Sequence, residues 1–170
     1  IEGYPSDDFM KLIADIRPEQ VTLVPDPPEV LTSNAGWDML TRKSFLIERV
    51  AFFKSLGCRV SLFVDPSARM VEAAAETGTD RVELYTEGYA SGFSENPEQA
   101  IRPYVEAALI AQEVKLGLNA GHDLNLENLR YFSRMIPGLL EVSIGHALIS
   151  DALYFGLENT VRMYREQLTS

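Results

Sequence analysis

The sequence predicts an α/β fold in which helices cover a parallel sheet. Along the 170 residues, short apolar segments alternate with amphipathic segments about five times, starting roughly 20–40 residues apart, as in successive strand-helix units. The chain contains neither a low-complexity segment nor a linker, so we expect residues 1–170 to form a single domain. Two architectures fit, an open five-stranded sheet or the larger part of a barrel. Ile1 resembles the last residue of a strand, which favours the barrel, although a closed eight-stranded barrel needs about 250 residues.

The expected strands are short, apolar and bounded by Pro, Gly or Asp. After the stub that ends at Ile1-Glu2, they cover residues 21–24, 60–64, 82–85, 114–118 and 140–144. Pro25 to Pro28 stops the first complete strand and opens a long loop to Gly36. Long loops at the carboxyl ends of strands are often lids or ligand loops.

Amphipathic segments separate these strands and predict helices. The expected helices cover residues 7–16, 38–56, 67–77, 97–113, 126–135 and 147–155, followed by a final helix from Leu157 to Leu168. Leu12 and Ile16 are expected on the buried face of the first helix, and Asp38 as the cap of the second. We expect a Gly/Ser-rich loop over residues 88–97 and a break at Pro103.

Composition excludes several classes of protein. With 15 Lys and Arg against 25 Asp and Glu, the net charge is -10, which disfavours non-specific binding to nucleic acid or to anionic membranes. No apolar run reaches the roughly 18 residues that a membrane span needs. The single cysteine, Cys58, excludes a disulfide framework and a cysteine-built zinc site, and we expect it to be buried. The first residues lack the features of a secretory signal, so a cytoplasmic protein is expected.

The two histidines of the chain stand in the same local setting. His122 and His146 each follow a glycine at the end of a predicted strand. Because parallel strands place their carboxyl ends at one edge, we expect both histidines on a common rim. The other side chains expected there are those of Glu2, Asp26, Thr32, Asp65, Thr86, Glu87 and Asn119. Histidine titrates near neutral pH and carboxylates can share its acid/base work, so the rim predicts proton-transfer chemistry.

Alternative roles exist for several of these residues. A histidine after a strand can be purely structural, and Thr32 can be a turn residue. His122, His146 and Glu2 could in principle hold zinc, but the short His spacing typical of zinc sites is missing, so no metal is expected. Gly145 before a helix predicts phosphate binding, because free N–H groups at a helix start attract anions.

Four segments resemble the pyridoxine 5′-phosphate synthase family. They are LGLNAGHDLNLENL, EVSIGHALISDALYFGLENTV, AAAETGTDRVELYTEGYA and QVTLVPDPPEVLTSNAGWD. The resemblance covers essentially all 170 residues, and the motifs Asn-Ala-Gly-His and Ile-Gly-His-Ala are its most specific part.

The resemblance implies a (β/α)8 TIM barrel with extra helices, of which this chain carries the end of strand 3 through strand 8. It also implies a homo-octamer without metal or organic cofactor. The implied reaction condenses 1-deoxy-D-xylulose 5-phosphate with 3-amino-2-oxopropyl phosphate to give pyridoxine 5′-phosphate, phosphate and water. Glu2 and His122 match the family's catalytic carboxylate and histidine, and Thr32, Asp123, Gly145 and His146 match its substrate-binding positions.

The family's first strands, with a further catalytic histidine and phosphate-binding arginines, find no match in this sequence. We therefore expect the chain to be the carboxyl-terminal two-thirds of the barrel. Two other functions stay open, a phosphate-ligand binder without catalysis and another phosphosugar-handling barrel enzyme. A Schiff-base aldolase would need a lysine at a strand end, whereas Lys115 lies at a predicted strand start.

Overall fold

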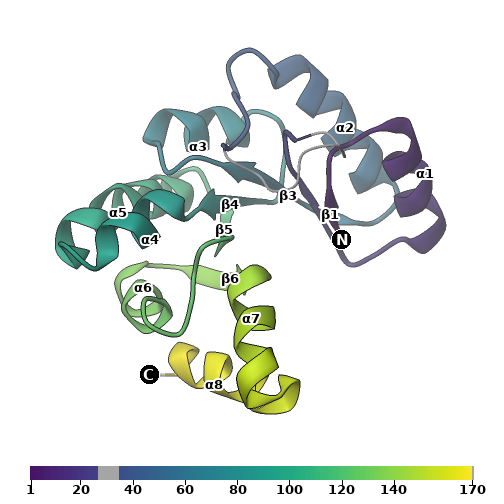
Figure 1. Ribbon diagram of the computed structural model, residues 1–170. Helices are drawn as coiled ribbons and strands as arrows, with labels where there is room; N and C mark the ends of the chain where they lie inside the picture. Colours follow the sequence, from purple (N-terminus) through teal and green to yellow (C-terminus); the bar gives the residue numbers. More distant parts are fainter. Residues whose placement is uncertain (27–34, 170) are drawn as a thin grey trace.

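The computed structural model describes residues 1–26 and 35–169, which fold into a curved parallel sheet with helices on its outer side (Figure 1). Among these residues the sheet has six strands in chain order. They are β1 (Glu2–Gly3), β2 (Gln20–Leu23), β3 (Arg59–Val64), β4 (Arg81–Tyr85), β5 (Gly117–Gly121) and β6 (Leu139–Ser143). Each strand pairs in parallel with the next, so the predicted α/β fold is confirmed as a half-barrel.

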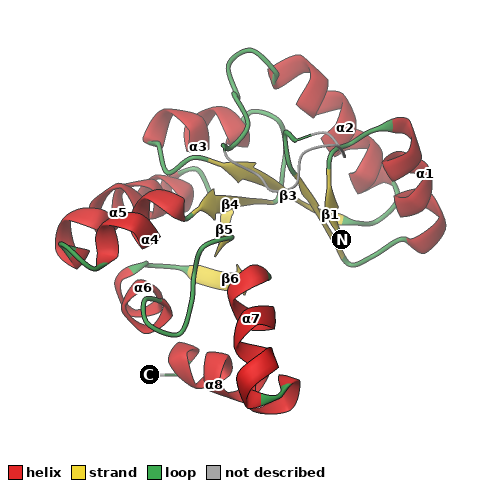
Figure 2. Ribbon diagram, in the orientation of Figure 1, coloured by secondary structure: helices red, strands yellow, loops and turns green. Residues whose placement is uncertain are grey.

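Helices connect the strands and follow one another around the outside of the sheet (Figure 2). They are α1 (Asp7–Ile16), α2 (Lys43–Ser55), α3 (Ala68–Ala75), α4 (Glu87–Phe93), α5 (Pro97–Glu113), α6 (Leu129–Met135), α7 (His146–Phe155) and α8 (Leu157–Leu168). None of the helices in the described ranges is long and apolar enough to span a membrane.

The two faces of the sheet differ in character. Alternate strand residues such as Val21, Leu62 and Leu84 are fully buried and belong to the apolar core under the helices. Their neighbours in sequence face the inside of the curve and include the polar Thr22 and Glu83 as well as the aromatic Phe63. This differs from typical barrels, in which branched apolar residues fill the interior.

Side chains on the inner face form layers from every second strand. The upper layer, nearer the carboxyl ends of the strands, consists of Thr22 in β2, Glu83 in β4 and Ser143 in β6. The lower layer consists of Gln20, Arg81 and Glu141 from the same strands. Gln20 Nε2 donates to Glu141 Oε1 at 3.1 Å although three strands separate β2 from β6, so the sheet is curved as in a barrel.

The segment expected to be a Gly/Ser-rich loop contains helix α4. Tyr89 of this helix is fully buried, and its hydroxyl donates to the Asn128 carbonyl at 2.7 Å. Its ring also packs edge-on against Tyr104 and Phe132, with centroids 5.9 Å and 5.0 Å away. The prediction was wrong because this tertiary anchor outweighs the low helix propensity of glycine and serine.

Three other local predictions were wrong. Helix α5 continues through Pro103, with Pro97 at its start and the Asn96 side chain as its cap. The strand expected over residues 114–118 is β5, displaced toward the carboxyl side, because Lys115 has a φ of 61° and separates α5 from the strand. Asp38 caps the turn before α2, accepting from the amides of Leu40 and Thr41.

Burial in α1 also differs from the prediction. Ile13 is fully buried, but Leu12 and Ile16 are 47% and 59% exposed. Helix α1 lies beside the two-residue strand β1 (Figure 1), and Ile13 is its one buried residue. Cys58 is buried, as predicted.

Candidate active site

The carboxyl ends of the strands bring together groups that are distant in sequence. His122 directly follows β5, and His146 begins α7 three residues after β6. Their ring centroids are 6.2 Å apart. Glu2 of the edge strand β1 interacts electrostatically with His122 and with Glu83. The fold therefore gathers both histidines and two carboxyl groups at one rim.

His122 has an unusual backbone conformation. Its φ of 93° lies in a region that residues other than glycine rarely adopt. Its N–H donates to the Ser143 carbonyl at 3.1 Å, and its Nδ1 lies 2.8 Å from Asp123 Oδ2. The ring of Tyr85 meets the imidazole edge-on, with centroids 5.2 Å apart. These contacts orient the ring, as a catalytic imidazole requires.

Glu83 is the site residue that our sequence reasoning missed. Its side chain lies in the upper layer, only 2% exposed, and accepts hydrogen bonds from the hydroxyls of Thr22 and Ser143. Burial raises the pKa of Glu83 to about 8, with the negative charge of Glu2 contributing. The signal in the sequence is a carboxylate between two apolar strand residues, Val82 and Leu84.

Gly121 makes room for Glu83. A Cβ at Gly121 would lie 2.6 Å from Glu83 Oε1 and 2.6 Å from the Ser143 carbonyl oxygen. The glycine before His122 is thus needed because the carboxyl group of the neighbouring strand crosses the space that a side chain would fill.

Glu2 occupies the edge of the sheet in a two-residue strand. It remains accessible to solvent, yet partial desolvation by its surroundings raises its pKa, opposed by the nearby His122. Glu2 and Glu83 therefore differ in burial and in proton affinity, which is the arrangement that separates an acid from a base.

Gly145 and His146 form the start of α7, one residue earlier than predicted. Gly145 occupies the N-cap position, where it offers no capping side chain, and a Cβ built on it would meet nothing within 4 Å. The first intrahelical bond runs from the Ile149 amide to the Gly145 carbonyl. No side chain of the described residues caps the first amides of α7, which leaves them available to an anion.

Of the other residues expected at the rim, Asp65 and Thr86 directly follow β3 and β4, as predicted, whereas Asn119 does not lie at a strand end. Thr32 lies outside the described residues. Asn119 lies within β5 and accepts from Arg81 Nη1 at 2.9 Å, so it belongs to the interior of the half-barrel. Asp65 accepts from the Gly36 amide at 3.1 Å and holds a loop in place. Thr86 is fully buried beside His122.

In the lower layer, the charge of Glu141 is compensated by Arg81 and by the neighbouring Arg59. Arg81 Nη1 lies 3.1 Å from Glu141 Oε2, and Arg59 Nη2 lies 3.8 Å from the same oxygen. Gln20 links both sides, accepting from Arg59 Nε at 2.7 Å and donating to Glu141. This end of the sheet resembles a structural ion-pair network.

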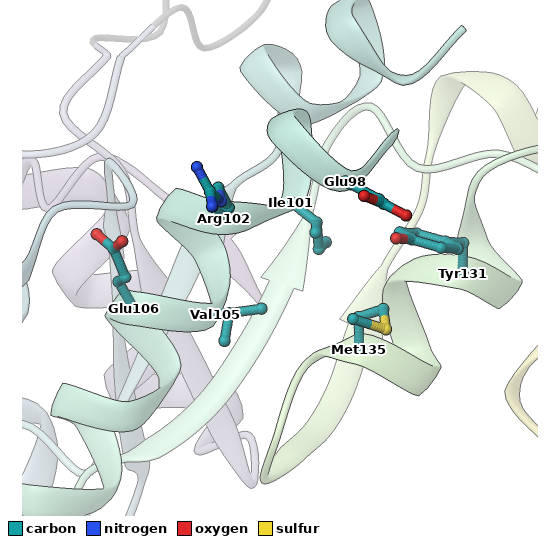
Figure 3. Close-up of a pocket in the computed structure, with 7 residues that line it drawn as sticks. All are labelled: Glu98, Ile101, Arg102, Val105, Glu106, Tyr131 and Met135. Carbon is teal, nitrogen blue, oxygen red and sulfur yellow. The ribbon is translucent and has the colours of Figure 1, made fainter. Parts of the chain in front are cut away.

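Metal-binding clusters and surface pockets are the other features that could mark a site. No group of three or more His, Cys, Asp or Glu within residues 1–26 and 35–169 could hold a metal ion. Figure 3 shows a surface pocket of about 380 Å³ between α5 and α6. Its lining combines the apolar Ile101, Val105, Tyr131 and Met135 with the charged Glu98, Arg102 and Glu106. The pocket lies on the outer helical layer, away from the strand ends that carry both histidines.

Comparison with known proteins places the chain in a family. The family model described as Pyridoxal phosphate biosynthesis protein PdxJ matches residues 1–170. The chain is 58% identical over 168 residues to pyridoxine 5′-phosphate synthase of Cytophaga hutchinsonii, covering 99% of this chain and 71% of that protein. It is 56% identical over 168 residues to the Porphyromonas gingivalis enzyme of the same name, with the same coverage.

A solved structure is similar in fold. The crystal structure of the Amycolatopsis orientalis BexX/CysO complex superposes with a TM-score of 0.56 at 12% identity, covering 93% of this chain and 59% of that chain. This likeness concerns the arrangement of strands and helices alone. The family match over residues 1–170 and the relatives at 56–58% identity show that the chain belongs to the PdxJ family, the family of the pyridoxine 5′-phosphate synthases.

Proposed function

We propose that the rim around His122 is part of the active site of a pyridoxine 5′-phosphate synthase. In this proposal Glu2, Glu83 and His122 move protons. The observation that carries it is the convergence of one imidazole and two carboxyl groups of different proton affinity at the strand ends. Family membership supports the same activity.

The proposed reaction joins 1-deoxy-D-xylulose 5-phosphate to 3-amino-2-oxopropyl phosphate. An amine attacks a ketone to form an imine, phosphate and water leave, and the ring closes. Every step moves a proton to or from carbon, nitrogen or oxygen, so one cavity needs several acid and base groups. Three such groups on β1, β4 and β5 meet this need.

The two carboxyl groups suit opposite tasks. Because burial raises its pKa to about 8, Glu83 is largely protonated at neutral pH and can donate a hydrogen bond or a proton to a developing oxyanion. In this proposal Glu2, which lies next to His122, is the proton acceptor of the pair. His122 interacts electrostatically with Glu2 and, in this proposal, exchanges protons with the substrate.

The phosphate groups are held, in this proposal, by backbone more than by basic side chains. The uncapped amides at the start of α7 attract one phosphate, and the His146 ring beside His122 places it near the reacting atoms. The Asp123 backbone and Thr32 add further substrate contacts, as the family resemblance implies. Helix termini can bind anions in this way even in a protein with a net charge of -10.

A homo-octamer in the cytoplasm also belongs to this proposal. Apolar side chains on α7 support burial in an assembly, since Leu153 and Tyr154 are 82% and 85% exposed. Light scattering of the purified enzyme tests the octamer, and a monomer at micromolar concentration would contradict it.

The experiment follows pyridoxine 5′-phosphate by its fluorescence after both substrates are mixed with the intact enzyme that carries this sequence. Wild-type enzyme should form product, and His122→Asn should lower kcat by about 10²–10⁴-fold with little change in thermal stability. His146→Asn is the matched variant, and it should act mainly by raising KM. Product formation at a near-normal rate by His122→Asn would overturn the role of this residue, and absence of product from wild-type enzyme would overturn the function.

A further inference from the structure

We propose that Thr86 is a positioning residue for His122, because its hydroxyl binds the peptide groups on both sides of the histidine. This inference rests on the proposed function. Thr86 directly follows β4, its side chain is fully buried, and it lies 36 residues before His122 in sequence.

The Thr86 hydroxyl makes two short hydrogen bonds. It donates to the Gly121 carbonyl at 2.6 Å and accepts from the Asp123 amide at 3.0 Å. The backbone N–H of Thr86 donates to the same Gly121 carbonyl at 3.2 Å. One residue of the neighbouring strand thus restrains the peptide planes before and after His122.

His122 needs such restraint because of its backbone conformation. A φ of 93° in a residue with a Cβ is strained by about 1–3 kcal/mol and persists only where the surroundings hold it. The third restraint comes from β6, where the Ser143 carbonyl accepts from the His122 N–H at 3.1 Å. The amide and both flanking peptide groups of His122 are therefore bonded to two neighbouring strands.

The hydroxyl of Thr86 is not used for the task that its position suggests. Thr86 is the N-cap of α4, where a threonine side chain usually accepts from an amide of the first helical turn, yet it makes no such capping bond. Its hydroxyl turns toward the corner between Gly121 and Asp123 instead. This use of the side chain indicates that the residue shapes the corner rather than the helix.

Removing the hydroxyl should release the corner without emptying the space. Thr86→Val keeps the shape of the side chain but leaves the Asp123 amide without this acceptor. His122 can then relax toward a negative φ, which moves its imidazole away from Glu2. Since a displacement of about 1 Å can lower a rate by about 10²-fold, we expect kcat to fall by about 10- to 100-fold with a smaller change in KM.

The matched control is Thr79→Val at the opposite end of β4. The Thr79 hydroxyl is similarly buried and donates to the Val60 carbonyl at 2.9 Å, away from the site. In the intact enzyme, Thr79→Val should lower thermal stability about as much as Thr86→Val but leave kcat within about 2-fold of wild type. Thr86→Ser retains the hydroxyl and should restore kcat to within about 3-fold.

A second readout does not depend on turnover. Hydrogen–deuterium exchange of peptides covering residues 119–125 should become faster in Thr86→Val and stay unchanged in Thr79→Val and Thr86→Ser.

If wild-type enzyme makes no product, the proposed function fails, and exchange alone decides whether Thr86 restrains the corner. Equal kcat losses in Thr86→Val and Thr79→Val, or unchanged exchange at residues 119–125, would overturn the inference. Should Thr86→Val fail to fold, the comparison of Thr86→Ala with Thr86→Ser takes its place, and equal kcat and exchange in these two would also overturn it.

Discussion

The upper and lower layers of the half-barrel are built by the same three strands but treat their charges differently. In the lower layer, Glu141 lies within ion-pair distance of Arg81 and Arg59. In the upper layer, Glu83 is held by the uncharged hydroxyls of Thr22 and Ser143, and its pKa is raised. The two layers are two residues apart along each strand. The carboxylate of Glu141 in the lower layer is paired with cations, whereas the carboxyl group of Glu83 in the upper layer favours its protonated form.

This difference suggests a division of labour within one sheet. Paired charges cost little to keep ionised and contribute to a fixed structure. A buried carboxyl without a cationic partner near it costs stability when it ionises, and that cost is what makes it useful as an acid near neutral pH. The lower layer therefore supports the barrel, whereas the upper layer is poised for chemistry.

Glu83→Gln is expected to have the largest effect on kcat, because it removes the ionisable group that distinguishes the upper layer from the lower one. The amide keeps the shape but cannot transfer a proton, so kcat should fall by about 10²-fold. Wild-type activity should decline as pH rises through about 8, where Glu83 ionises, and the variant should lack this decline. A pH profile of kcat for both proteins tests this, and an unchanged high-pH limb in the variant would exclude Glu83 as its source.

The free energy of unfolding should depend on pH through the ionisation of Glu83. Because the folded-state pKa of about 8 exceeds the ordinary glutamate pKa of 4.5, the contribution of Glu83 to stability is fully present below pH 4.5 and is lost as pH rises through 8. Glu2 and Glu141 add to the shift. Relative to wild type, Glu83→Gln should gain about 3–4 kcal/mol between pH 5 and pH 8 in urea unfolding. A pH-independent difference would contradict the buried, protonated carboxyl.

A smaller effect is expected from Gly121→Ala, which perturbs the upper layer sterically. The new Cβ would approach Glu83 Oε1 and the Ser143 carbonyl oxygen to 2.6 Å, and the backbone oxygen cannot move freely. We expect a loss of about 1–3 kcal/mol in stability and about a 10-fold loss in kcat. Gly57→Ala serves as the control for a destabilising glycine loss away from the site, since its φ of 84° makes alanine unfavourable there without crowding any neighbour. An equal kcat in both variants would show that the space at Gly121 is not needed.

In the lower layer, Arg81→Met should act on stability alone. The change leaves the buried Asn119 Oδ1 without its donor and removes one of the donors to Glu141, which keeps the bond from Gln20, so stability should fall by about 1–3 kcal/mol. We expect kcat to stay within about 3-fold of wild type and the pH profile to keep its shape. If the decline of kcat at high pH moved by a large amount in folded Arg81→Met protein, the two layers would not be independent.

The smallest effect is expected from Lys54→Met, outside both layers. Lys54 Nζ lies 2.7 Å from Asp80 Oδ1 on the surface, and the two side chains are 42% and 33% exposed. Exposed pairs of this kind contribute less than about 1 kcal/mol. Urea unfolding should show a change within that range, and a loss comparable to that of Arg81→Met would remove the distinction between surface and interior pairs.

The sequence by itself determined the order of the strands and of the helices other than α4, and the placement of both histidines after strands. Apolar periodicity and stop signals such as Gly78 and the Pro137-Gly138 pair are local, so they can be read without knowing the contacts of distant residues. The parallel pairing of successive strands follows from the same alternation. Resemblance to the family predicted the identity of the chain, which the comparisons confirm.

Only the tertiary structure decided which polar residues belong to the site. The proton affinity of Glu83 depends on burial between β2 and β6, and the task of Thr86 depends on a corner that lies 36 residues away. Helix α4 forms because Tyr89 is anchored in the core, where its hydroxyl donates to the Asn128 carbonyl. Desolvation and long-range hydrogen bonds arise from neighbours in space, so no pattern in adjacent residues could have shown them.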